Sequence, residues 1–188
     1  MIPKVFFIYS RIYDMHWREI YKENYPSQED IIRYISRIEK VWKKHGNKIL
    51  KKLSYISGLK WKEDIKCYVV GRVRAFSEPL TIGLWNKDEE FIDNLVHELI
   101  HNLLRQNDSE LKNYWINLYK RYPKTNIRTR VHIPVHAIHK ELYLKMFTKK
   151  RLDKDIRFCK TKPDYKKAWD IVLSKDCLKE IKKYAKSR

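Results

Sequence analysis

Between residues 27 and 58, apolar side chains recur every three or four positions, the spacing of a helix that is buried along one side. The predicted stripe consists of Ile31, Ile35, Ile38 and Trp42. Ser27 and Asp30 have the spacing of a capping pair that opens this helix, and Gly46 is expected to end it after a cationic KKH turn. A second, shorter helix is predicted from there to Gly58.

The pattern changes after Gly58. Residues 65–73, IKCYVVGRV, are rich in β-branched and aromatic side chains and predict a strand. Pro79 breaks the chain before a second predicted strand, LTIGLW, at residues 80–85. A short strand or extended arm is expected at the N-terminus, so the first half of the chain predicts a small sheet accompanied by helices.

A further helix is predicted from Asn86 to about Arg105. Asn86 is a suitable N-cap, and Glu89 occupies the reciprocal position of a capping box. The apolar positions that recur at helical spacing are Phe91, Leu95, Leu99 and Leu103. One face of this helix is therefore expected to be buried.

The second half of the chain predicts helices only. A segment SELKNYWINLYKRY ends before Pro123, and a segment IPVHAIHKELYLKMF is expected to start its helix at Pro134. Two basic helices are predicted near the C-terminus, the first opened by Pro163 and the last capped by Ser174. The whole pattern indicates an α+β fold with a small twisted sheet and a mainly helical C-terminal half.

The chain is strongly basic, with 42 Lys and Arg against 23 Asp and Glu and a formal net charge of +19. This charge predicts attraction to polyanions, and nonspecific contact with nucleic acid is one expected consequence. A lysine-rich, glycine-poor composition is also typical of adaptation to high temperature, so the charge alone does not identify a ligand. The four glycines are isolated, which excludes the glycine-rich phosphate loops of nucleotide-binding proteins.

The three cysteines form no CxxC pair, which argues against a disulfide framework and against a cysteine zinc ribbon. No apolar run approaches the ~18 residues of a membrane span, and the N-terminal VFFIY run is too short for the core of a signal peptide. The sequence therefore predicts a soluble, cytoplasmic protein without membrane contact. Its oligomeric state is left open.

The stretch VHELIHNLL contains the candidate metal ligands and the candidate catalytic residue. His97 and His101 are four residues apart and lie on one face of the predicted helix, where both imidazoles can bind one ion. Neutral imidazole suits Zn²⁺, and the adjacent Glu98 can take a proton from an activated water. The mid-helix position, the apolar neighbours and the strand just upstream favour a zinc site over a chance occurrence of HExxH.

Catalytic zinc usually has three protein ligands, so a third donor is needed. Projected on a helix from Pro134, His139 lies inside the apolar arc, His136 lies at its edge, and Glu141 lies on the opposite side. This projection favours His136 as the third ligand, with His139 as the close alternative. His132, just outside the predicted helix, is an alternative ligand or a group that supports a ligand or faces substrate.

With its strand, helix, HELIH and inward-facing histidine, the chain resembles the zincin superfamily of zinc metallopeptidases. The resemblance implies one zincin-like domain over residues 1–188, with an upper lobe to about residue 106 and a helical lower lobe from 107 that supplies the third ligand. It also implies that LTIGLW is the edge strand to which an extended peptide adds. The subfamily is not assigned, because the metzincin pattern requires Gly at position 104 and His at 107, where this chain has Leu104 and Asn107. SprT-like proteases are similar in ligand set and charge, but their zinc ribbon is missing here.

The resemblance implies a zinc metalloendopeptidase in which Glu98 is the general base and a peptide or protein is the substrate. The oxyanion would be stabilised by His132, His139 or Tyr143. The alternative is a basic nucleic-acid-binding protein whose zinc is structural, held by His136 and His139 together with the motif pair. A third possibility is a latent enzyme in which the segment from Arg151 covers the cleft.

Overall fold

A computed structural model of the chain describes residues 1–186. These residues form eight helices and four short strands, so the fold is α+β and mostly helical, as expected. They fold as two compact units. The first unit comprises Met1–Lys51 and Trp61–Asn102, and the second comprises Lys52–Lys60 and the residues from Leu103 onward.

The first unit contains the sheet. Its strands are β1 (Val5–Ile8), β2 (Ile65–Val69), β3 (Phe76–Ser77) and β4 (Leu80–Ile82). Their order is β1-β2-β4-β3, in which β1, β2 and β4 are parallel and β3 is antiparallel to β4. The prediction that LTIGLW forms an edge strand is therefore wrong. The strand at the edge of the sheet next to β4 is β3, which was not predicted because it is only two residues long.

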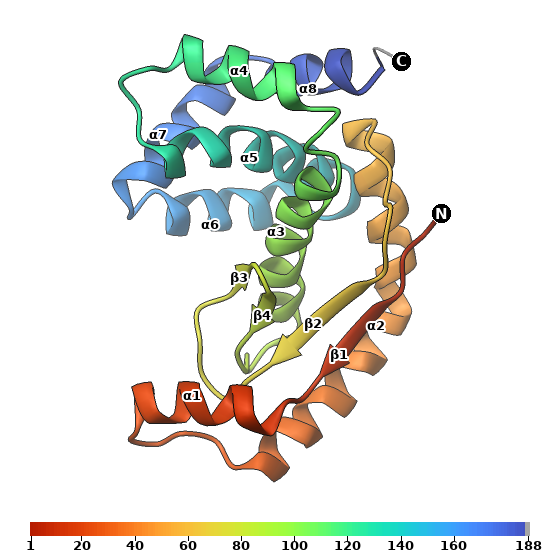
Figure 1. The fold of residues 1–188 in the computed structure, drawn as a ribbon, viewed down its shortest axis with the longest axis vertical. Coiled ribbons are helices and arrows are strands. Elements are labelled where there is room, and N and C mark those ends of the chain that lie inside the picture. The colour runs from red at the N-terminus through yellow and green to blue at the C-terminus, as the bar shows by residue number, and fades with distance from the viewer. Residues whose placement is uncertain (187–188) are drawn as a thin grey trace. The chain divides into compact units, whose positions relative to one another are not determined.

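Helices cover both faces of this sheet (Figure 1). On one face, the Phe7 ring lies 6.4 Å from the Trp42 ring of α2 (Gln28–Ser57) and 5.8 Å from the Phe91 ring of α3 (Asp88–Gln106). On the other face, Tyr13 of α1 (Arg11–Tyr21) packs 5.4 Å from Tyr68 and forms a 3.0 Å hydrogen bond with Thr81. The sheet is thus a layer between α1 and the pair α2 and α3.

The helix α2 runs unbroken for 30 residues, so the prediction that Gly46 ends it is wrong. Gly46 instead leaves space for a neighbouring side chain. A Cβ at this position would lie 2.4 Å from the ring of Trp42, one turn earlier on the same helix. The capping pair was predicted correctly, because the Ser27 hydroxyl accepts a hydrogen bond from the Asp30 amide and the Asp30 carboxylate accepts one from the Ser27 amide.

Helix α1 was not predicted from the sequence. A buried carboxylate attaches it to the rest of the unit. Asp14 is 1% exposed and accepts hydrogen bonds from the Tyr25 hydroxyl at 2.5 Å and from the Gly71 amide at 2.9 Å. Gly71 follows β2, so this one side chain joins α1, the loop before α2 and the end of a strand. Ser10 caps α1 by accepting from the Tyr13 amide.

The second unit contains α4 (Lys112–Arg121), α5 (Ile127–Met146), α6 (Lys149–Cys159), α7 (Pro163–Ser174) and α8 (Cys177–Lys186). Within it, α5 contacts α6, α7 and α8. Figure 1 shows α5 and α6 running side by side. Every residue of α5 from His132 to His139 is buried, which makes it the core helix of the unit.

Three expectations about these helices are corrected. The helix α5 begins seven residues before Pro134, and Asn126 caps it by accepting a 2.8 Å hydrogen bond from the Thr129 amide. The helix α6, between the predicted Pro134 and Pro163 segments, was not anticipated as a separate element. The last helix begins at Cys177, and its cap is Asp176 rather than Ser174, because the Lys179 amide donates to the Asp176 carboxylate.

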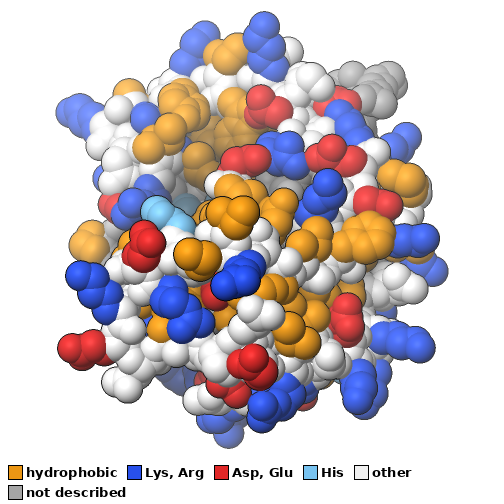
Figure 2. All heavy atoms as spheres, turned by 60° about the horizontal axis from the view of Figure 1, so that its bottom comes forward, with side chains coloured by type: hydrophobic (Ala, Val, Ile, Leu, Met, Phe, Trp, Pro, Cys, Tyr) orange, Lys and Arg blue, Asp and Glu red, His pale blue; other side chains and the backbone are white. Residues whose placement is uncertain are grey.

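None of the helices in residues 1–186 has both the length and the apolar character needed to cross a membrane. On the face drawn in Figure 2, Lys and Arg side chains are spread widely, with Asp and Glu among them and hydrophobic side chains near the middle. The basic character of the chain is therefore visible as a distributed surface charge on this face rather than as a single patch.

Candidate metal centre

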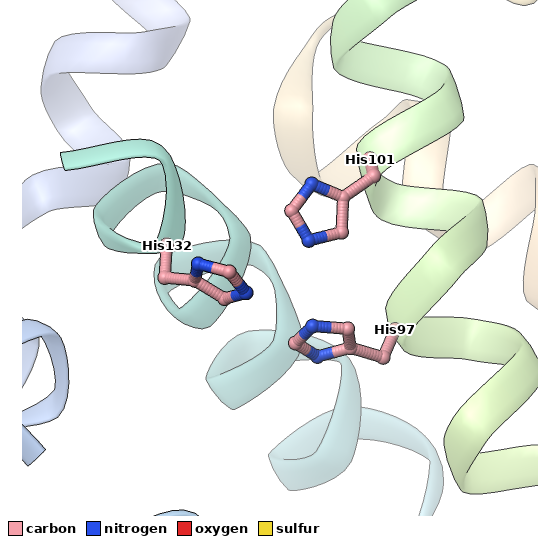
Figure 3. Close-up of side chains that lie close together, drawn as sticks. All are labelled: His97, His101 and His132. Atoms are coloured by element: carbon pink, nitrogen blue, oxygen red, sulfur yellow. The ribbon is translucent and has the colours of Figure 1, made fainter. Parts of the chain in front are cut away.

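His97 and His101 project from the same side of α3, as the motif predicted (Figure 3). Their ring centroids are 5.1 Å apart, and the ring planes are inclined at 62°. Both side chains are partly exposed, whereas the apolar stripe of the helix is fully buried. That stripe consists of Phe91, Leu95, Leu99 and Leu103, each 0% exposed. The buried face fixes the rotation of the helix, and this rotation turns the imidazole pair outward from the core.

Two features hold this helix in place. Its first turn contains Asp88, Glu89 and Glu90, whose negative charges complement the positive end of the helix dipole. One turn after Glu98, the buried Asn102 side chain donates to the backbone oxygen of Ser77 in β3 at 3.3 Å. The segment of α3 that carries the motif is thereby attached to the edge of the sheet.

Glu98 is only 7% exposed, and burial raises the pKa of its carboxyl to about 7. The positive charge of Arg74 partly opposes this rise in pKa. A carboxyl that gains and loses a proton near neutral pH is suited to general acid–base work, because the ideal catalytic pKa lies close to the working pH. The chemistry expected of Glu98 is thus compatible with its surroundings.

His132 lies within α5 rather than outside a helix, and its ring orientation is defined. The Nδ1 atom is 2.8 Å from the backbone oxygen of Arg128, one turn earlier. A carbonyl oxygen can only accept, so Nδ1 carries a proton, and in the neutral ring Nε2 then presents its lone pair. This is the arrangement commonly found in metal-binding histidines, whose second nitrogen donates to a carbonyl or carboxylate.

One group of three side chains among the described residues has the donor atoms to hold a metal ion. His97 and His101 offer their ring nitrogens from α3, and His132 offers one from α5 (Figure 3). Three neutral imidazoles are the ligand set of some catalytic zinc sites. The residues therefore fit a zinc ion by their chemistry.

The other two histidines of α5 are fully buried within the helical unit. His136, which the sequence analysis favoured as the third ligand, stacks on Trp169 of α7 with ring centroids 4.3 Å apart and an angle of 11°. His139 lies 3.7 Å from a carboxylate oxygen of Asp155 in α6 and 4.2 Å from the Tyr143 ring. Both rings therefore face α6 and α7.

The remaining candidate residues of α5 are Tyr143 and Glu141, and the contacts of both are defined. Tyr143 is 0% exposed and packs 5.0 Å from Phe147. Glu141 is partly exposed and lies 3.8 Å from the Lys145 ammonium group, one turn later on the same helix. The outward position that the sequence projection gave to Glu141 agrees with this ion pair.

The start of α5 was the signal that sequence reasoning missed. Asn126 and Thr129 have the spacing of an N-cap and its amide donor, which would have placed His132 on the helix. His132, His136, His139 and Tyr143 then follow at intervals of four, three and four residues, which is one helical face. No protein-family model, curated protein or solved structure matches this chain, so the zincin resemblance stays a prediction from the residues.

Proposed function

We propose that the chain is a zinc-dependent endopeptidase of zincin type, in which His97, His101 and His132 hold the ion and Glu98 is the general base. The observation that carries the proposal is the pair of imidazoles on one side of α3 together with the buried carboxyl of Glu98 on the same helix. The proposal includes the finer fold expectation, a zincin-like domain whose helical part supplies the third ligand. It also includes an intracellular, reducing location, based on the three free cysteines.

The geometry of the motif pair supports a common ion. The His97 and His101 rings lie on one side of α3 with their centroids 5.1 Å apart, so both can turn a nitrogen toward one ion at the zinc–imidazole bond length of about 2.0–2.1 Å. His132 is preferred to His136 here because its Nδ1 already donates to a carbonyl, which leaves Nε2 as the ligand atom.

A bound zinc ion supplies positive charge that polarises the scissile carbonyl and lowers the pKa of a water molecule toward ~7. The Glu98 carboxylate accepts the proton of the attacking water as the new C–O bond forms, and it delivers that proton to the leaving amine as the C–N bond breaks. His139 and Tyr143, the oxyanion donors expected from the sequence, are buried against Asp155 and Phe147 and are not part of the proposal. The two motif histidines are partly exposed, as side chains that meet a substrate must be.

The activity test compares wild type with Glu98→Gln and with Glu39→Gln, a control on the exposed side of α2. Each protein is loaded with one equivalent of zinc and incubated with an unstructured protein such as casein, and new amino termini are counted. Loss of a general base lowers the rate by about 10²- to 10⁴-fold, while the control keeps its rate. Equal rates for wild type and Glu98→Gln would contradict the assigned role.

The ligand test measures zinc affinity by competition with a chelating dye. His132→Ala is expected to weaken zinc binding strongly, because one of three protein ligands is removed, while His45→Ala on α2 leaves it unchanged. Loss of affinity in His136→Ala and not in His132→Ala would instead support the ligand that the sequence projection favoured. Four histidine ligands would indicate a closed, structural zinc site and would support the alternative of a nucleic-acid-binding protein.

A further inference from the structure

The positive charge of the chain is concentrated in one of its two units. Residues 52–60 and 103–188 carry 26 Lys and Arg against 9 Asp and Glu, whereas the rest of the chain carries 16 against 14. Almost the whole net charge of +19 therefore comes from the helical unit. A peptidase site on α3 does not account for this asymmetry.

Within the helical unit, α6 presents three of these charges in a row. Lys150, Lys154 and Arg157 are exposed and follow one another at intervals of four and three residues, which places them on one face of the helix. The helical rise of ~1.5 Å per residue separates them by about 6 Å and about 4.5 Å along the axis. None of the three forms an ion pair with any described residue, so their charges are not neutralised.

Other basic residues of the same helix are neutralised. Lys149 lies 2.7 Å from the Asp153 carboxylate, and Lys160 lies 2.7 Å from that of Asp170. The contrast shows that carboxylates are within reach of α6 but lie away from the row. The row is therefore a distinct, unpaired cationic surface rather than part of a surface network of ion pairs.

An exposed aromatic ring adjoins this row. Phe158 follows Arg157 and is 67% exposed, although a phenylalanine is normally buried. The Lys162 ammonium group lies 5.8 Å from the centre of its ring. A ring with cations beside it offers a face on which a nucleic-acid base can stack while the cations contact phosphates.

We propose that this surface, formed by Lys150, Lys154, Arg157 and Phe158, binds single-stranded nucleic acid. The row of cations tracks the phosphates of one strand, and Phe158 stacks on a base. A membrane surface is a poorer match, because an interfacial helix exposes a broad apolar face, whereas α6 buries Leu152 and exposes one ring. Duplex DNA is a poorer match because its bases are already stacked and offer Phe158 no partner.

The test measures binding of the full chain to a fluorescently labelled 15-nucleotide strand of mixed sequence, as DNA and as RNA, by fluorescence anisotropy. Phe158→Ala is expected to weaken binding about tenfold, and Phe158→Tyr to retain it, because both aromatic rings stack. The triple variant Lys150→Ala, Lys154→Ala, Arg157→Ala is expected to reduce the slope of log affinity against log salt by about 2, which is ~0.7 for each lost phosphate contact.

A matched triple variant on α2 separates a defined surface from general charge. Lys40, Lys44 and Lys48 are also exposed and are spaced four residues apart, but their replacement by alanine is expected to leave affinity within about twofold. Equal losses from the two triple variants would overturn the proposal. So would an unchanged affinity of Phe158→Ala, or tighter binding of duplex than of single strands.

The proposal does not rest on the metal centre. Glu98→Gln, inactive under the proposed function, is expected to bind the labelled strand as wild type does. Displacement of the strand by vesicles of anionic phospholipid, together with no effect of Phe158→Ala, would assign the surface to membranes and overturn the nucleic-acid proposal. The two proposals therefore fail independently of each other.

Discussion

Replacing Glu98 by glutamine is expected to stabilise the metal-free protein, and by an amount that depends on pH. The ordinary pKa of the carboxyl is 4.5, and burial raises it to about 7 in the folded chain. Between these two values the unfolded chain has lost its proton and the folded chain keeps it, so folding stability falls as pH rises through the window. Glutamine cannot ionise and does not incur this loss.

The magnitude follows from the same two values. A difference of one pH unit in pKa corresponds to about 1.4 kcal/mol, so the full window is equivalent to about 3 kcal/mol, of which about 2 kcal/mol are expected between pH 5 and pH 8. The difference in unfolding free energy between Glu98→Gln and wild type is therefore expected to be about 2 kcal/mol larger at pH 8 than at pH 5. Contributions of titrating groups that do not interact with Glu98 cancel in this comparison.

The assay is urea unfolding of both proteins at pH 5 and pH 8 with a chelator present throughout. Glu39→Gln, an exposed substitution on α2, serves as the control and is expected to change stability by less than about 0.5 kcal/mol at either pH. A difference between Glu98→Gln and wild type that is the same at both pH values would refute the reasoning, because it would mean that burial does not raise the pKa. The account of Glu98 as a base that titrates near neutral pH would then be lost.

Three further substitutions test the described packing and the site. Tyr25→Phe removes the hydroxyl that donates to the buried Asp14 carboxylate, and a loss of about 1.5–3 kcal/mol is expected in urea unfolding. Gly46→Ala is expected to destabilise the protein by about 1–3 kcal/mol, although alanine favours helices, because the new Cβ would overlap the Trp42 ring. His132→Ala is expected to abolish the rise in melting temperature that zinc gives the wild type, since ligand binding stabilises only a protein that retains its site.

Long, regular apolar stripes were predicted correctly from sequence. The stripe of α3 and the strand β2 lie where the spacing placed them, because burial of one face decides both the rotation of a helix and the position of a strand. The continuous helix α2 was mispredicted at Gly46. Local propensity favours a stop at glycine, but here the absence of a side chain lets the ring of Trp42, one turn earlier on the same helix, lie over the position, and the propensity of a single residue does not include this contact.

The same distinction applies to the candidate site. The pair His97 and His101 and the neighbouring Glu98 follow from a fixed spacing on one helix, which sequence alone defines. The choice among the histidines of α5 depended on where that helix begins. Pro134 is a good first residue of a helix, yet here it lies inside one, because the Asn126 cap starts the helix earlier. That error left His132 outside the predicted helix and moved the choice to His136.

Metal analysis of the purified protein tests the central claim most directly. Wild type and a His97→Ala, His101→Ala variant are incubated with excess zinc, dialysed together against metal-free buffer, and measured by inductively coupled plasma mass spectrometry. The account predicts one zinc ion per wild-type chain and none in the variant. A wild-type zinc content no higher than that of the variant would contradict it.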